Sequence, residues 1–522
     1  MATTTSQEQV TTLLPLDTQA AYYKWLVAGI VLMASGTQTF AGNSITLAIP
    51  RLMATFGADL AATQWVMTGF LIARTLVIPL LGWLGGLLGH RTLFVVGMAG
   101  FFVCTIGCGL STSLIMLIAF RLLQGLLLGS LGGLNSVILM QAFPRHQRGL
   151  ALGLRAIGTS TGQIISFTLG GYLIEHISWR VIFFLGAPAG LLAAILGLMV
   201  LPQHREARGI PVDYLGLLAL GGFLVPLLLA ISFARNNETA VSTLLLLSGA
   251  ALLSGVLFVV WELRTHFPVV NLRLFRQTVF RCLCGTAFIY NIGLFGAQFM
   301  IPIFLQQVMG FSPMQVGLLI APALVMSGLS GVAIGRLCDF VPLPFIVLSG
   351  LSALTLVFYT LSSVTAMTTA GVLLGIIIFY RMCMHAVTTP VTALNAQLLA
   401  PEQVRMGQGL LGVVRNIGAG FGVTVASVLF ERRRVPQQAQ AYNLYNDTSP
   451  EHLSVLDEIK RGLYEGGMDA TAVDQGALRL IRRQMDVEAI ASGFQGSFIL
   501  ACAAFFVASL PMLWILRLRN RG

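Results

Sequence analysis

The chain has 522 residues, of which 56% are hydrophobic and only 10% are charged. A soluble protein carries about 25% charged residues, so no soluble core could hide this much apolar surface. The net charge of +11 does not indicate nucleic-acid binding, because the basic residues form no dense run beyond Arg432-Arg433-Arg434 and are not interleaved with aromatic side chains. We therefore expect an all-α polytopic membrane protein whose surroundings are the lipid bilayer, with no nucleic-acid partner.

Fourteen stretches are long and apolar enough to be spanning helices, which need about 20 apolar residues each. In chain order the predicted spans are 25–49, 63–85, 92–111, 114–139, 149–174, 179–201, 214–234, 240–261, 281–307, 313–337, 343–362, 366–395, 407–430 and 492–516. The basic residues of the short loops gather on the side of the N-terminus, and only Arg51, Arg180 and Arg235 lie on the other. By the positive-inside rule, both termini face the cytoplasm, and the protein is predicted to lie in the cytoplasmic (inner) membrane.

A long motif recurs in the two halves of the chain. Span five contains Arg155-Ala-Ile-Gly158-Thr-Ser-Thr-Gly162, and span thirteen contains Arg415-Asn-Ile-Gly418-Ala-Gly-Phe-Gly422. The repeat predicts two parallel halves with the substrate site between them. We expect a cytoplasmic tail (1–24), a six-helix bundle (25–201), a linker with two additional helices (202–280) and a second six-helix bundle (281–518).

The second bundle includes a polar outer loop, 432–489. Its helical spacing of Leu453, Leu456, Ile459 and Leu463 favours a small outer helical hairpin over the exit, and a mobile tether is the alternative. The paired glycines of the repeated motif, Gly158 with Gly162 and Gly418 with Gly422, favour close helix approach. These seams could slide during transport or serve static packing alone.

Five arginines fall at membrane depth, away from the ends of the predicted spans: Arg74, Arg121, Arg155, Arg381 and Arg415. No acidic residue does. Each arginine at membrane depth costs about 2.5–3.5 kcal/mol, so we expect the set to line a wet cavity that attracts anions. The alternative for each is snorkelling, or a bond to a helix carbonyl. His385 is the only embedded histidine and a candidate proton carrier, unless it is simply a hydrogen-bonded core residue.

Several motifs resemble the fourteen-span drug–proton antiporters of the major facilitator superfamily. Span four reads Arg121-Leu-Leu-Gln124-Gly125-Leu-Leu-Leu-Gly129, and further matches begin at Trp179, Asp213 and Trp261. The resemblance implies two six-helix bundles with two inserted helices, and proton coupling through Arg121. It also implies a cytoplasmic gating motif at Gly82, Gly89 and Arg91, with a second copy at Gly335 and Asp339, and a span-five motif that includes Gly162, Gly170 and Gly171.

The chain departs from this family in its acidic residues. Ala41, two residues before Asn43, stands where members usually carry an aspartate, and the first gating motif has lost its aspartate. We therefore expect an exporter whose cargo is amphipathic and anionic or neutral rather than cationic.

The predicted function is secondary active export by alternating access, coupled to protons. Arg74, Arg155, Arg381, Arg415, Asn43 and Gln124 would line the cavity, and Arg121 and His385 would serve coupling. The alternatives are an uncoupled facilitator or flippase of an anionic lipid or metabolite, and a non-transporting membrane sensor or assembly platform. No phosphate-binding loop or catalytic constellation is present, so we expect no enzyme activity, no metal and no cofactor. A periplasmic adaptor protein is a candidate partner.

Overall fold

The computed structural model describes residues 20, 22–78, 81–144, 148–203, 213–233, 241–265, 268, 272–364, 368–398, 401–446, 460–465 and 470–519. Most of the tail 1–24 lies outside this set, as do Leu453, Leu456 and Ile459 of the outer loop. Within the described residues the chain is helical and contains no strand. This agrees with the predicted all-α class.

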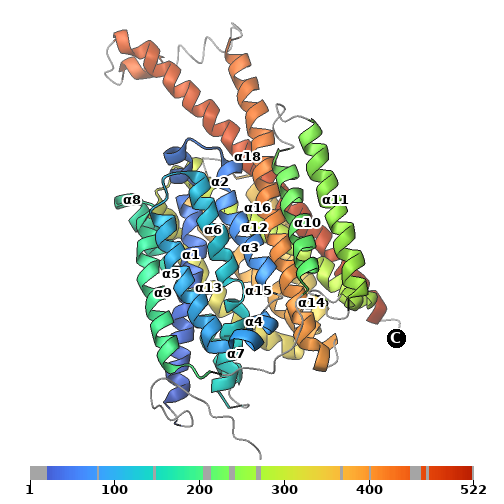
Figure 1. Ribbon diagram of the computed structural model, residues 1–522. Helices are drawn as coiled ribbons and strands as arrows, with labels where there is room; N and C mark the ends of the chain where they lie inside the picture. The colour runs from blue at the N-terminus through green and yellow to red at the C-terminus, as the bar shows by residue number, and fades with distance from the viewer. Residues whose placement is uncertain are drawn as a thin grey trace, which may run out of the picture.

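The first half of the chain packs its helices into one bundle (Figure 1). Its helices are α1 (Tyr23–Phe56), α2 (Leu60–Thr63), α3 (Trp65–Val77), α4 (Leu81–Leu88), α5 (His90–Gly109), α6 (Leu114–Leu128), α7 (Leu131–Ala142), α8 (Arg148–His176) and α9 (Val181–Val200). The pairs α2–α3 and α6–α7 each form one crossing, and both pairs are apolar enough for a membrane.

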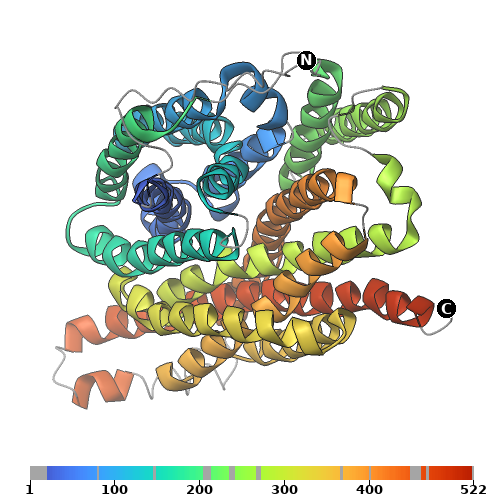
Figure 2. The same cartoon turned by 90° about the horizontal axis from the view of Figure 1, so that it is seen from below.

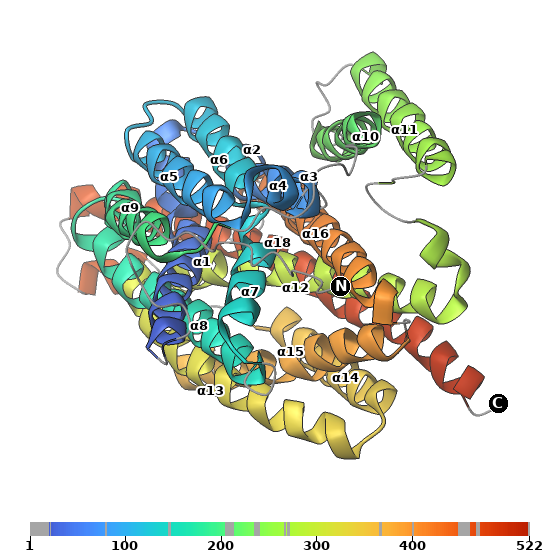
Figure 3. The ribbon, with the colours of Figure 1, turned by 60° about the horizontal axis from the view of Figure 1, so that its bottom comes forward.

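The second half forms a similar bundle, with two extra helices before it. The extra helices are α10 (Tyr214–Phe233) and α11 (Val241–Arg264), followed by a short 3-10 turn, η3 (Leu272–Arg276). The bundle consists of α12 (Thr278–Gln307), α13 (Pro313–Phe340), α14 (Leu343–Ser362), α15 (Ala370–Leu398), α16 (Pro401–Asn446) and α18 (Ala470–Arg519). Figure 3 shows α10 and α11 side by side at one flank of the molecule, where α10 contacts α3 and α16.

The two bundles repeat the same helix pairings. In the first, α1 packs on α8, α5 on α9 and α3 on α6; in the second, α12 packs on α16, α14 on α18 and α13 on α15. Thirteen helices or helix pairs among the described residues are long and apolar enough to cross a membrane. The fourteenth predicted span, α8, is as long as its neighbours but less apolar. The count of fourteen, the side on which the termini lie and the domain borders therefore stay predictions.

Local sequence signals set several helix ends. Ser312 and Gln315 form a capping box in which each side chain accepts a hydrogen bond from the other residue's backbone N–H, and Pro313 occupies the first turn of α13. Gly57 ends α1 in the left-handed region at φ 59°, and Gly89 separates α4 from α5 at φ 80°, conformations that favour glycine.

The helices α16 and α18 are much longer than the spans predicted for them. They continue through parts of the segment 432–489 and extend past the ends of the other helices (Figure 1). Seen along the bundle, the first part of α18 reaches beyond its edge (Figure 2). The Gln438 side-chain amide donates to the Asp486 carboxylate at 2.8 Å and joins the two extensions.

Candidate functional site

The five embedded arginines come from five different helices and differ in burial. Arg121 on α6 and Arg381 on α15 are buried, with 1% and 6% of their surface exposed. Arg74 on α3, Arg155 on α8 and Arg415 on α16 are half-buried. The structure therefore divides the arginines into groups with different surroundings.

Arg121 lies in dry packing inside the first bundle. Its guanidinium donates to the Gln124 side-chain oxygen at 2.7 Å and to the Ala41 carbonyl at 3.0 Å. The rings of Phe70 and Phe183 enclose it, with centroids at 5.5 and 5.3 Å. Gln124 in turn donates to Thr105. Arg121 and Gln124 thus form a buried network with neutral acceptors, out of reach of a substrate in this conformation.

Arg74 and Arg155 converge on the backbone of α7. Arg155 donates to the Gly132 carbonyl at 3.0 Å, and a guanidinium nitrogen of Arg74 lies 3.1 Å from the point that a Cβ on Gly132 would occupy. The two charges are close enough to act on each other. The Arg74 Nε is buried without a hydrogen-bond partner, and no ion pair of either arginine occurs among the described residues. Two like charges with spare donors suit a carboxylate, sulfonate or phosphate.

Asn43 lies on α1 in the first bundle but does not join this pair. It is half-buried, and its side-chain amide donates to the Thr39 carbonyl one turn earlier on the same helix at 2.9 Å. Its expected contact with the substrate stays a prediction.

The second bundle holds Arg381, His385 and Arg415. Arg415 donates to the Thr392 hydroxyl at 2.8 Å, and Arg155 likewise reaches a residue 23 positions earlier in the chain, so the two motif arginines match. The Arg381 Nε is buried without a partner, and its guanidinium faces the Tyr380 ring at 5.5 Å. One turn further on α15, the His385 Nε2 lies 3.0 Å from the Ser327 hydroxyl.

The paired glycines of the repeated motif lie at matching helix crossings. A Cβ on Gly158 would lie 2.7 Å from the Leu32 carbonyl oxygen, and one on Gly162 would meet the carbonyl of Gly36. In the second bundle a Cβ on Gly418 would lie 2.5 Å from the Phe288 carbonyl oxygen, and one on Gly422 would meet that of Ile292. Each pair seats its helix on two carbonyls one turn apart, so neither crossing has room for a larger residue.

The gating residues are dispersed along the chain. Gly82 lies in α4, and Gly89 and Arg91 lie at the junction of α4 and α5. Gly335 lies on α13 with open space where a Cβ would be. Asp339 lies near the end of the same helix, and its side chain is outside the described part. Their gating role stays a prediction.

A direct contact between the two bundles is a feature that the sequence did not reveal. A Cβ on Gly171 of α8 would meet the Pro313 carbonyl, and one on Gly317 of α13 would meet the Phe167 carbonyl. The neighbouring Gly170 is less crowded, with the Ser44 Cβ at 3.3 Å. This end of the molecule is the one that the predicted topology places outside.

Hydrogen bonds join the bundles at the same end. The Met314 N–H donates to the Glu175 carboxylate at 3.0 Å, and the Gln306 side chain donates to the Leu47 carbonyl at 3.3 Å. The capping box at Ser312 could have indicated a helix start, but no local pattern announces a contact across 139 residues. The structure is thus closed at the predicted outer end. We call the contacts between α8 and α13, which include the Met314–Glu175 hydrogen bond, the outer contact.

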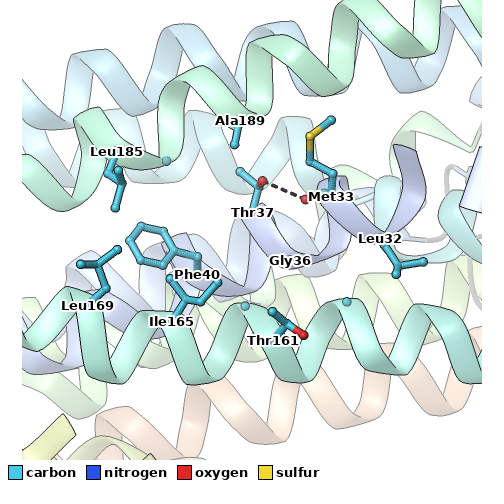
Figure 4. Close-up of a pocket in the computed structure, with 13 residues that line it drawn as sticks. Leu32, Met33, Gly36, Thr37, Phe40, Thr161, Ile165, Leu169, Leu185 and Ala189 are labelled. Atoms are coloured by element: carbon cyan, nitrogen blue, oxygen red, sulfur yellow. Dashed lines mark hydrogen bonds between the residues drawn. The ribbon is translucent and has the colours of Figure 1, made fainter. Parts of the chain in front are cut away.

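A separate apolar pocket of about 460 Å³ lies between α1, α8 and α9 (Figure 4). Gly36, Gly158 and Gly162 form part of its lining, so it adjoins the crossing of α1 and α8. The Thr37 hydroxyl is engaged by the Met33 carbonyl at 2.8 Å. None of the five arginines lines it. The pocket therefore offers hydrocarbon surface and no place for a charged group.

Comparisons with known proteins agree with this architecture. The sequence profile of the Major Facilitator Superfamily matches residues 28–423. Among solved structures, a bacterial homologue of the human lysosomal transporter Spinster, in an inward-facing and occupied conformation, has a TM-score of 0.60 at 16% identity, covering 94% of this chain and 97% of that one. A D-xylose–proton symporter has a TM-score of 0.55 at 13% identity, covering 91% and 98%. The chain belongs to the major facilitator superfamily.

Curated relatives are more similar in sequence. The multidrug resistance protein B homolog of Mycobacterium tuberculosis H37Rv is 30% identical over 413 residues, covering 77% of this chain and 75% of that protein. The multidrug export protein EmrB of Escherichia coli K12 is 26% identical, covering 82% and 84%. The fatty acid resistance protein FarB of Neisseria gonorrhoeae is 25% identical, covering 96% and 97%. The protein is a multi-pass membrane transporter for small molecules, not an enzyme.

Proposed function

We propose that this protein exports amphipathic organic compounds by alternating access, and that its cargo is anionic or neutral rather than cationic. The observation that carries this proposal is the convergence of Arg74 and Arg155 on Gly132, with spare donors and no carboxylate bound to either among the described residues. A cation would be repelled there, whereas an anion would relieve the repulsion between the two guanidinium groups.

The names of two relatives support an amphipathic cargo. The gonococcal relative is named for resistance to fatty acids, which are amphipathic anions, and the mycobacterial one for multidrug resistance. Alternating access is supported by the repeated helix pairings and by the outer contact, which joins the halves at the predicted outer end. The basic side of the short loops supports a cytoplasmic-membrane location with both termini inside. The extensions of α16 and α18 are the surface to which an adaptor could bind.

Two energy sources are compatible with an anionic cargo. A proton could be bound at His385, since Arg121 is enclosed in neutral packing; alternatively, the membrane potential could act on the charge of the anion without any coupled ion. The second case corresponds to an uncoupled facilitator or a flippase.

The cargo is tested with two permanently charged probes of equal chain length. Proteoliposomes are loaded with radiolabelled decanesulfonate or decyltrimethylammonium, and flux above that of protein-free liposomes is measured. We expect flux of the sulfonate only. Each charge-assisted hydrogen bond contributes about 1.5–3 kcal/mol, so Arg74→Gln and Arg155→Gln should each lower apparent affinity by about tenfold or more. Arg281→Gln, an exposed arginine at the start of α12, is the control. Flux of the ammonium probe alone would refute the proposal.

A further inference from the structure

The charges at membrane depth determine whether cargo and proton can exclude each other. Away from the ends of the predicted spans, the ionisable cationic groups are the five embedded arginines and His385, and every carboxylate lies outside those spans. On α1 the Ala41 carbonyl accepts a hydrogen bond from Arg121, so a neutral acceptor holds this guanidinium. No acidic group in these spans can release a proton when cargo binds.

His385 has only cationic and neutral neighbours in the described structure. Arg381 lies one turn away on α15 and acts on it electrostatically, and Ser327 on α13 bonds its Nε2. From α12, the Tyr290 hydroxyl donates to the Met384 carbonyl beside it, and Arg415 on α16 lies close enough to act on Tyr290. A proton on His385 therefore adds a positive charge to a region that already holds two arginines.

This arrangement fixes the sign of any coupling between proton and anion. An anion at Arg381 would stabilise a proton on His385, and by reciprocity the proton would strengthen anion binding. Proton and cargo would then strengthen each other's binding rather than displace each other. Exchange of an inward proton for an outward anion requires the opposite, namely that each displaces the other.

We propose that this protein exports its anion electrogenically, driven by the inside-negative membrane potential, with no proton moving inward in exchange. The inference rests on the proposed anionic cargo. In the proposed cycle no proton leaves with the anion either, so only the charge of the anion crosses the membrane. A potential of 100 mV supplies about 2.3 kcal/mol per charge, which sustains a gradient of about fifty-fold.

The experiment separates voltage from pH in proteoliposomes that contain the full-length protein. Decanesulfonate stays anionic at every pH used. With equal pH on both sides, potassium gradients and valinomycin set the voltage; with the voltage clamped at zero, a pH gradient is imposed. We expect accumulation to change about tenfold per 60 mV and to ignore the pH gradient. Protein-free liposomes report passive leakage within the assay time.

The variants address the groups invoked. His385→Gln should keep the same dependence of accumulation on voltage even if its rate falls, whereas Arg381→Gln should lower the rate. Accumulation that follows the pH gradient at zero voltage and is lost in His385→Gln would overturn the inference while leaving the anionic cargo in place. Absence of decanesulfonate flux under both gradients, with flux of decyltrimethylammonium, would overturn the cargo and the inference together.

Discussion

Gly317 on α13 offers a direct test of whether the outer contact opens during transport. A Cβ at this position would meet the Phe167 carbonyl of α8, so Gly317→Val forces the two bundles apart at this end. Overpacking of this kind typically costs about 1–3 kcal/mol. Because the clash lies between the bundles, the cost falls on the closed arrangement and spares the open one. The equilibrium should then shift towards opening by about 5- to 150-fold.

Hydrogen–deuterium exchange measures this shift without attaching a probe group to the protein. The Met314 N–H is protected by Glu175 in the closed arrangement, so peptides covering the start of α13 should exchange about 5- to 150-fold faster in Gly317→Val. Gly328→Val is the matched control, because it lies on the same helix and nothing lies within 4 Å of its added Cβ. Equal exchange in the two variants would show that the contact is not a moving boundary.

Three further predictions concern other contacts. Glu175 lies one residue beyond the predicted span, and hydrogen bonds from the Ser312 hydroxyl, and secondarily from the Met314 N–H, lower its pKa. Its ionised carboxylate therefore stabilises the outer contact above the ordinary glutamate pKa of 4.5, and this stabilisation is lost as the pH falls through the lowered pKa. The Met314 N–H should therefore exchange faster in Glu175→Gln than in the wild type at pH 7, and the two exchange rates should become equal in strong acid. A rate difference that does not change with pH would contradict this prediction. Gly422→Val should destabilise the second bundle by about 1–3 kcal/mol in thermal unfolding, whereas Gly412→Val on the same helix should be neutral, since it meets no atom within 4 Å. Arg121→Ala should lose about 2–5 kcal/mol of stability, because it leaves a cavity and removes the donor to the Gln124 and Ala41 oxygens. Any folded fraction should keep the wild-type pH profile of transport; a stable variant with a changed profile would restore the coupling role.

The class of fold was predictable because hydropathy and the repeated motif are local signals. Glycines spaced by four fall on one face of a helix, so the spacing of Gly158 with Gly162 and of Gly418 with Gly422 is enough to predict tight crossings. Helix length was less predictable. The apolar stretch of α16 ends near residue 430, but its backbone hydrogen bonds continue to Asn446. Hydropathy locates the end of an apolar segment and does not locate the end of a helix.

The candidate site was only partly predictable. The sequence places each arginine at membrane depth, but it does not say which neighbour accepts its hydrogen bonds. Arg121 and Arg155 therefore looked equivalent, although the first is enclosed by Phe70 and Phe183. The second donates to the Gly132 carbonyl, and Arg74 lies beside the same glycine. The outer contact depended on pairing α8 with α13, and such pairing is set by the packing of distant segments, not by any pattern within either.

The outer contact also bears on inhibition. While Gly171 and Gly317 hold the backbones of α8 and α13 together, a compound arriving from the predicted outer face meets a closed surface and cannot reach Arg74 or Arg155 by that route. A blocker of those arginines would have to arrive from the cytoplasm or the inner leaflet. A compound restricted to the outside would instead have to capture the open form, and its apparent potency would depend on how often that form appears.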